Sequence, residues 1–130
     1  MNLKFHGRIL VFMSLCLSLS FPLRAQELDS GKKIYKTSCL ACHGKTGAGD
    51  SRMAKILNVE PILLDLTQGL VLQKQDSELL SIVSDGLTMM PSFKNLYSQE
   101  QILSAVLYIR ALQLDARTKK TPARKKRANP

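Results

Sequence analysis

The chain has 130 residues, of which 45% are hydrophobic, and its formal net charge is +9 at pH 7. The charge is unevenly placed, because residues 26–116 carry nine Lys or Arg against ten acids, whereas residues 117–130 carry seven basic residues and no acid. A body of this length suffices for one small domain and excludes two.

Residues 1–25 are typical of a secretory signal peptide. Lys4 and Arg8 are basic, residues 9–23 are mostly apolar, and Ala25 provides a small residue at a plausible cleavage point. The apolar stretch is shorter than the roughly 20 residues that span a bilayer, so a retained membrane anchor is only the alternative. We therefore expect export to the bacterial periplasm.

A helix is predicted at the start of the mature body, from about Ser30 to Ser38. Gly31 and Tyr35 are four residues apart and so share a face of this helix. The glycine permits close approach of a second helix, and the ring offers a surface on which that helix can stack. We expect the last helix of the chain to be the partner. The alternative is a glycine that is merely tolerated on a surface helix.

The sequence Cys39-Leu40-Ala41-Cys42-His43 has the spacing at which a c-type haem is attached. Each thiol can add to one vinyl group of the porphyrin, and one helical turn places Cys39 and His43 on the same face. His43 is thereby held under the iron. A haem fixed by two thioether bonds and a histidine does not dissociate.

Two other kinds of site use the same residue types. A structural zinc site requires about four Cys or His ligands, and beyond the signal segment the chain has only Cys39, Cys42 and His43. A thioredoxin-like dithiol needs a βαβ setting, whereas the flanks of this motif are predicted to be helical. Haem attachment is the preferred interpretation, and a disulfide or redox dithiol is the alternative.

The segment 44–50, directly after the haem motif, is rich in glycine. Its Gly-Lys-Thr is not a phosphate-binding loop, because that motif needs a glycine five positions before the first of these residues, where Cys39 stands. The glycines are expected to let the backbone turn tightly around the haem edge. Residues 53–59 are predicted to hold a short helical turn, and residues 62–67 an apolar loop against the cofactor.

Two further helices are predicted in the second half of the chain. Asp76 or Ser77 can cap the first, which ends at Gly86. Ser98 forms a capping box with the glutamine three residues later and begins the last helix, whose broad apolar stripe reaches about Leu114.

The segment 86–93 between these helices is too short and too interrupted for a regular element, and it carries two thioethers, Met89 and Met90. Pro91 drives the residue before it into an extended conformation, from which one side chain can project at a metal. Adjacent residues of an extended chain point in opposite directions, so only one of the two can ligate. Without a cofactor, both methionines would simply fill the core.

In the order of its motifs the chain resembles a class I cytochrome c over about residues 29–114. The marks are Gly31 and Tyr35 in the first helix, the haem motif Cys39 to Gly44, Asp65-Leu66-Thr67, the capped helix leading to Gly86, Met90-Pro91 with Phe93, and Tyr108 in the last helix. The resemblance implies an all-α cytochrome c fold over residues 26–116. This fold is a small helical domain wrapped around one covalently bound haem, with its terminal helices packed against each other.

The resemblance also implies a role for each residue of the haem site. Cys39 and Cys42 are the thioether anchors of a single haem c. The proximal iron ligand is His43, and the distal ligand is Met90, with Met89 as its rival. With both axial positions filled, the iron has no vacancy for a substrate, so we expect an electron-transfer protein and not an enzyme.

The expected function is that of a periplasmic one-electron carrier, either free or as the haem subunit of an oxidoreductase complex. Redox partner proteins would dock transiently at an exposed haem edge. The alternative, from another class, is a haem sensor or peroxide-reactive protein in which the distal methionine is labile.

The basic tail, residues 117–130, has hardly any apolar residue and is predicted to be disordered. Its simplest role is to keep the protein in solution. A sharper hypothesis is binding to an anionic membrane surface or an acidic partner, at about 1 kcal/mol per basic residue near a charged membrane. Nucleic acid is not expected as a partner of an exported chain.

Overall fold

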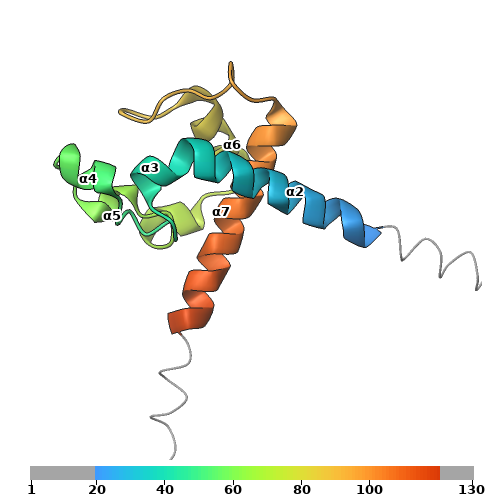
Figure 1. Cartoon of the computed structure of the whole chain (residues 1–130), viewed down its shortest axis with the longest axis horizontal. Coiled ribbons are helices and arrows are strands. Elements are labelled where there is room, and N and C mark those ends of the chain that lie inside the picture. The colour runs from blue at the N-terminus through green and yellow to red at the C-terminus, as the bar shows by residue number, and fades with distance from the viewer. Residues whose placement is uncertain (1–19, 121–130) are drawn as a thin grey trace, which may run out of the picture.

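The computed structural model describes residues 20–120, and the regular elements of this range are all helical (Figure 1). They are α2 (Ser20–Ile34), the π-helix η1 (Tyr35–Cys39), α3 (Leu40–His43), α4 (Arg52–Ile56), α5 (Pro61–Leu64), the 3-10 helix η2 (Gly69–Gln73), α6 (Asp76–Asp85) and α7 (Gln99–Lys120). Extended backbone pairs within this range only as two isolated bridges, Ala48 with Asp65 and Leu87 with Met90. The predicted all-α class is confirmed.

The first and last helices of this range, α2 and α7, cross each other (Figure 1), and Gly31 of α2 lies against Ser104 of α7. Gly31 is buried, and a β-carbon at this position would overlap the carbonyl oxygen of Ser104 on α7. Beside the crossing, the rings of Tyr35 and Tyr108 lie with their centroids 5.3 Å apart at an angle of 57°. The predicted pairing of Gly31 and Tyr35 with the last helix is therefore confirmed.

The buried apolar residues of the described range form two clusters. The larger joins α6, α7 and the segment between them, and its buried members are Leu79, Val83, Phe93, Ile102 and Val106. The smaller joins η1 to α7 through Tyr35, Cys39 and Ile109. Because Cys39 belongs to the second cluster, the haem motif is anchored directly to the core of the domain.

The N-terminal helix is longer than predicted, since α2 begins at Ser20 and not at Ser30. Pro22 lies in its first turn, where a proline is tolerated, and neither glycine nor proline follows before Gly31. The helix thus runs through Ala25, the expected cleavage point. The remainder of the predicted signal peptide, residues 1–19, and the alternative of a retained anchor lie outside the described residues.

The short helical turn predicted for residues 53–59 is present as α4, whereas the segment after it differs from the prediction. α4 covers residues 52–56, and the Oγ of Ser51 accepts a hydrogen bond from the backbone N–H of Ala54 at 3.0 Å. Part of the expected loop 62–67 is helical, because α5 begins at Pro61. Proline suits the first turn of a helix, where its missing N–H would have no intrahelical partner.

The predicted capping residue of α6 is wrong. The cap is Gln75 and not Asp76 or Ser77, because the side chains of Gln75 and Glu78 form a reciprocal capping box across the first turn. The backbone N–H of Gln75 donates to Oε2 of Glu78 at 2.8 Å. The predicted end of this helix at Gly86 is confirmed.

The last helix begins with the predicted capping box. The backbone N–H of Ser98 donates to Oε1 of Gln101 at 2.9 Å, and the backbone N–H of Gln101 donates to Oγ of Ser98 at 3.3 Å. These bonds satisfy backbone donors that the helix start would otherwise leave unpaired.

The predicted end of this helix at Leu114 is wrong, since α7 continues to Lys120. Neither glycine nor proline interrupts residues 99–120, and Arg117, Lys119 and Lys120 suit the negative end of the helix dipole. The first four residues of the basic tail, 117–120, are therefore helical and not disordered. The rest of the tail, residues 121–130, lies outside the described part of the chain.

None of the helices between residues 20 and 120 combines the length and the apolar character that a membrane crossing requires.

Candidate functional site

The two cysteines of the haem motif lie on consecutive short helices. Cys39 is the last residue of η1 and the N-cap of α3, whereas Cys42 lies within α3. Cys39 is buried, Cys42 is half-buried, and both are free thiols. Burial, with a smaller contribution from Cys42, raises the pKa of the Cys39 thiol to about 11. A thioredoxin-like dithiol needs a cysteine whose pKa is lowered, so this environment does not support that alternative.

His43, the last residue of α3, directs its Nδ1 at the backbone carbonyl of Leu64, 2.7 Å away. A carbonyl oxygen can only accept, so Nδ1 carries the hydrogen and Nε2 keeps its lone pair. Burial lowers the pKa of His43, and the hydrogen bond to Leu64 opposes this effect only in part. The lowered pKa keeps the imidazole neutral. A neutral ring with a free Nε2 and a hydrogen-bonded Nδ1 is the form in which histidine binds a metal.

The turn after His43 is closed by hydrogen bonds to its own backbone. Gly44 has φ +77° and Gly49 has φ +73°, values at which residues other than glycine are strained. The N–H of Gly49 donates to the carbonyl of His43 at 2.9 Å, and the hydroxyl of Tyr35 donates to the carbonyl of Gly44 at 2.8 Å. Burial raises the pKa of Tyr35 above its usual range, so this hydroxyl remains a donor. The glycine-rich loop therefore makes the predicted tight turn.

The two methionines of the segment between α6 and α7 lie in different environments. Met90 is half-buried and packs against the larger apolar cluster, whereas Met89 is 69% exposed. Leu87 and Met90 exchange backbone hydrogen bonds of 3.1 and 2.8 Å, which closes a tight turn before Pro91. The inward position of Met90 agrees with its expected role, and its assignment as the distal ligand stays a prediction.

One polar contact links the two segments that carry the predicted iron ligands. The hydroxyls of Ser38 and Tyr97 form a hydrogen bond of 2.7 Å. Ser38 directly precedes Cys39, and Tyr97 belongs to the segment that follows Met90. In Figure 1 the first part of the segment between α6 and α7 extends toward the side of the molecule on which α3 lies, and the chain then returns to the start of α7.

The exposed apolar side chains provide a test of whether a haem fits this site. Eleven large apolar side chains are exposed in the part of the chain that the structure describes, and seven of them fall within residues 56–89, between the haem motif and Met90. They are Ile56, Leu57, Ile62, Leu63, Leu70, Leu87 and Met89. A small domain rarely leaves so many apolar side chains in water unless a ligand or partner covers them. The two free thiols and the free Nε2 form a donor set that fits a covalently attached haem, and these apolar side chains all come from the segments between the two predicted iron ligands.

A zinc site is not supported by the structure. Within residues 20–120, no three His, Cys, Asp or Glu side chains are grouped so that they could hold a metal ion.

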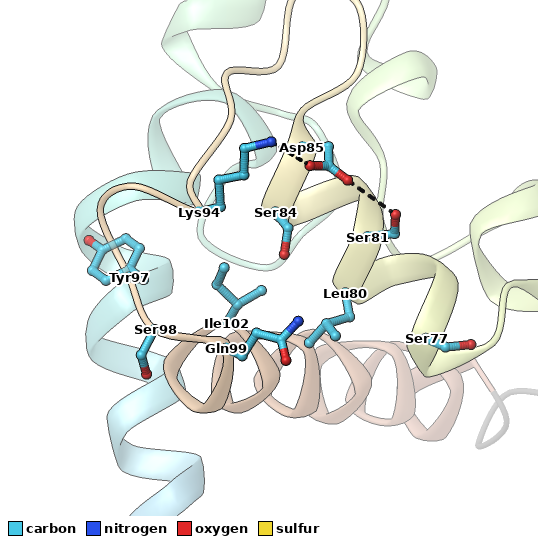
Figure 2. A pocket seen from close by; sticks show the side chains of 10 residues that line it. All are labelled: Ser77, Leu80, Ser81, Ser84, Asp85, Lys94, Tyr97, Ser98, Gln99 and Ile102. Atoms are coloured by element: carbon cyan, nitrogen blue, oxygen red, sulfur yellow. Dashed lines mark hydrogen bonds and ion pairs between the residues drawn. The ribbon is translucent and has the colours of Figure 1, made fainter.

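A separate groove of about 360 Å³ lies between α6 and the start of α7 (Figure 2). It is lined by Ser77, Leu80, Ser81, Ser84, Asp85, Lys94, Tyr97, Ser98, Gln99 and Ile102. Its charged side chains neutralise each other, since Lys94 and Asp85 form an ion pair of 2.9 Å. None of the predicted site residues lines this groove, so it is not the predicted centre.

Residues 26–109, more than half of the chain, match the protein family described as cytochrome c oxidase, cbb3-type, subunit III. The chain belongs to this cytochrome c family. Cytochrome c6 of Leptolyngbya boryana is 31% identical to it over 86 residues, which are 64% of this chain and 89% of the relative. Cytochrome c-553 of Nitratidesulfovibrio vulgaris is 46% identical over 41 residues, which are 32% of this chain and only 39% of that relative's length. The resemblance to class I cytochromes c is thereby confirmed, and the helical fold is that of a cytochrome c.

Proposed function

We propose that this cytochrome c family member is a periplasmic one-electron carrier with a single haem c. Cys39 and Cys42 would hold the haem through thioether bonds, with His43 and Met90 as axial ligands. The bound haem would supply the one-electron couple of its iron. The observation that carries the proposal is the hydrogen bond from His43 to the carbonyl of Leu64, which leaves Nε2 free in a motif whose two cysteines are free thiols. The names of the relatives, cytochrome c6 and cytochrome c-553, support the same class of function.

The rigid packing of this domain would favour electron transfer. Tyr35, buried against α7, fixes the turn after His43, and the crossing at Gly31 fixes α2 against α7. A protein that need not move when its iron changes charge exchanges electrons with little reorganisation. Redox partner proteins would dock at the haem edge, where a small contact surface suits transient exchange. Whether it acts free or within an oxidoreductase complex, this surface would serve the same exchange.

Covalent attachment can be tested by the mass of the exported protein. The mature wild-type chain is expected to carry the mass of one haem that denaturation and acid–acetone extraction do not remove. The double variant Cys39→Ser, Cys42→Ser is expected to lose that mass completely, because no thiol remains to add to the vinyl groups. Met90→Leu, which leaves both thiols in place, is the control and should keep the haem. An exported wild-type protein with free thiols and no haem would contradict the proposal.

We further propose that the basic tail binds anionic lipid surfaces. α7 carries the chain to Lys120, where Lys119 is paired with Asp115 at 2.6 Å, and the sequence beyond this helix holds four further basic residues and no acid. Changing four tail residues to glutamine should lower affinity for phosphatidylserine vesicles at least tenfold at low salt. These residues are Arg124, Lys125, Lys126 and Arg127.

The matched control changes four exposed lysines of the body to glutamine, namely Lys32, Lys36, Lys45 and Lys55. This control has the same net charge as the tail variant, so it should bind the vesicles nearly as well as the wild type if position matters. Co-sedimentation at several salt concentrations measures both. An equal loss in the two variants would show that net charge alone is responsible, and no loss in either would refute lipid binding.

A further inference from the structure

The side chain of Gln113 on α7 is a buried amide with only 3% of its surface exposed. Its Nε2 donates to the backbone carbonyl of Leu66 at 2.8 Å, and its Oε1 accepts from Nη1 of Arg110 at 2.9 Å. A buried amide is costly to leave unpaired, so both bonds constrain what surrounds it. Gln113 therefore ties the last helix to the segment that follows α5.

Arg110 determines which way the Gln113 amide faces. The guanidinium can only donate, so the oxygen of Gln113 must point to Arg110 and its NH₂ group must point to Leu66. Arg110 is itself anchored at the start of α6, where Nε donates to Oδ1 of Asp76 at 2.8 Å and Nη2 donates to the carbonyl of Lys74. The orientation of the amide is thus fixed by contacts far from the haem motif.

The segment that Gln113 holds also supplies the hydrogen-bond acceptor for His43. Leu64, two residues before Leu66, accepts from Nδ1 of His43 at 2.7 Å. On the opposite side, the N–H of Leu66 donates to the carbonyl of Gly47 at 2.7 Å. Leu66 is therefore bonded through both its N–H and its carbonyl. The Asp65 carboxylate also accepts from the N–H and the hydroxyl of Thr67, so loss of either Leu66 bond would loosen, and not free, the backbone two residues from the acceptor of His43.

We infer that Gln113 is a positioning residue for the His43 imidazole, acting through the backbone from Leu66 to Leu64. Its amide holds the Leu64 carbonyl at the distance at which His43 keeps its Nδ1 hydrogen and presents Nε2. The inference rests on the proposed function, because it concerns the orientation of the proximal ligand of the haem.

The test follows the exchange of the His43 Nδ1 hydrogen with solvent in the reduced, haem-loaded protein by NMR. It uses deuterium exchange or, where exchange is fast, water saturation transfer. Gln113→Leu removes the donor to Leu66 and is expected to accelerate this exchange about tenfold, the equivalent of one lost hydrogen bond. The acceleration should exceed that of the slowest backbone amides of α7, which report global opening. A purely structural role would accelerate both alike.

Two further variants separate positioning from general destabilisation. Gln113→Glu keeps the acceptor for Arg110 but has no donor for Leu66, so it should behave like Gln113→Leu. Ser104→Ala removes another hydrogen bond of the same helix, from Ser104 Oγ to the carbonyl of Glu100, and should leave the ratio of His43 to amide exchange unchanged. If the Gln113 variants yield no haem-loaded protein, Arg110→Gln is expected to show the same selective effect at about threefold.

If Gln113→Leu accelerates exchange of the His43 Nδ1 hydrogen no more than exchange of the slowest α7 amides, the role of Gln113 is overturned. The same result in Arg110→Gln overturns it where only that variant loads haem. A wild-type protein that loads haem without His43 as a ligand would overturn the proposed function and this inference together. The two failures are distinguishable, because the second is visible in the wild-type spectrum before any variant is made.

Discussion

Replacing Met90 by leucine is expected to lower the reduction potential by on the order of 100 mV or more, whereas replacing Met89 by leucine should leave it unchanged. A thioether ligand favours the reduced iron, and axial ligands as a whole set haem potentials over a range of about 0.8 V. Leucine keeps nearly the volume of methionine, so packing against the larger apolar cluster is disturbed little. A potentiometric titration of both variants measures the difference.

The matched pair makes this prediction specific to one residue. Met89 and Met90 are neighbours and have the same chemistry, but Met89 is 69% exposed whereas Met90 is half-buried. Met90→Leu should also let the reduced protein bind carbon monoxide, which the wild type and Met89→Leu should not. A lowered potential in Met89→Leu with an unchanged potential in Met90→Leu would reverse the assignment. Unchanged potentials in both would exclude methionine ligation by this segment.

Gly31→Ala is expected to lower the free energy of unfolding by about 3 kcal/mol. The added β-carbon would overlap the carbonyl oxygen of Ser104, a backbone atom that cannot turn aside as a side chain can. Relief requires that α2 and α7 move apart, which disturbs the packing of Tyr35 on Tyr108 as well. Denaturant unfolding of the haem-loaded protein, followed by far-ultraviolet circular dichroism, measures the loss.

Gly69→Ala provides the control for this prediction. Gly69 has φ +70°, but a β-carbon added there would meet no atom within 4 Å, so only backbone strain of about 1 kcal/mol is expected. Equal losses at the two positions would show that close helix approach at Gly31 contributes nothing beyond the ordinary penalty for replacing glycine.

The helix crossing and the position of the haem motif could be predicted because they depend on side chains with distinctive chemistry. Gly31 and Tyr35 at helical spacing indicated a close helix partner, and the structure places Ser104 and Tyr108 of α7 against them. The capping box at Ser98 was predictable for the same reason, since its side chains are read directly from the sequence.

The lengths of the terminal helices were predicted wrongly. Residues 1–25 were expected to be a cleaved signal peptide, and residues 117–130 a disordered basic tail. α2 extends back to Ser20 through the expected cleavage point, and α7 runs on to Lys120 into the basic block. Both extensions lack internal helix breakers, so the intrinsic propensity of these stretches carries the helix beyond the packed core. The π-helix at residues 35–39 likewise leaves no mark in the sequence that precedes Cys39.

The hydrogen bond that orients His43 was not predicted from the sequence, because its acceptor is a backbone atom. Any residue at position 64 offers the same carbonyl, so Leu64 carries no sequence signal for this role. Gln113, which holds the neighbouring Leu66, lies 47 residues farther along the chain. A polar residue in the apolar stripe of the last helix was the one visible sign, and its partners are known only once the fold has brought them together.

The proposed one-electron transfer requires that His43 and Met90 both bind the haem iron. A potentiometric titration of the mature wild-type protein is the most direct test of this ligation. Absorption spectra are recorded across the titration and after addition of carbon monoxide to the reduced form. We expect a single reversible one-electron transition, the weak far-red absorption of methionine-ligated haem in the oxidised form, and no binding of carbon monoxide. A five-coordinate spectrum with rapid carbon monoxide binding would contradict ligation by both residues.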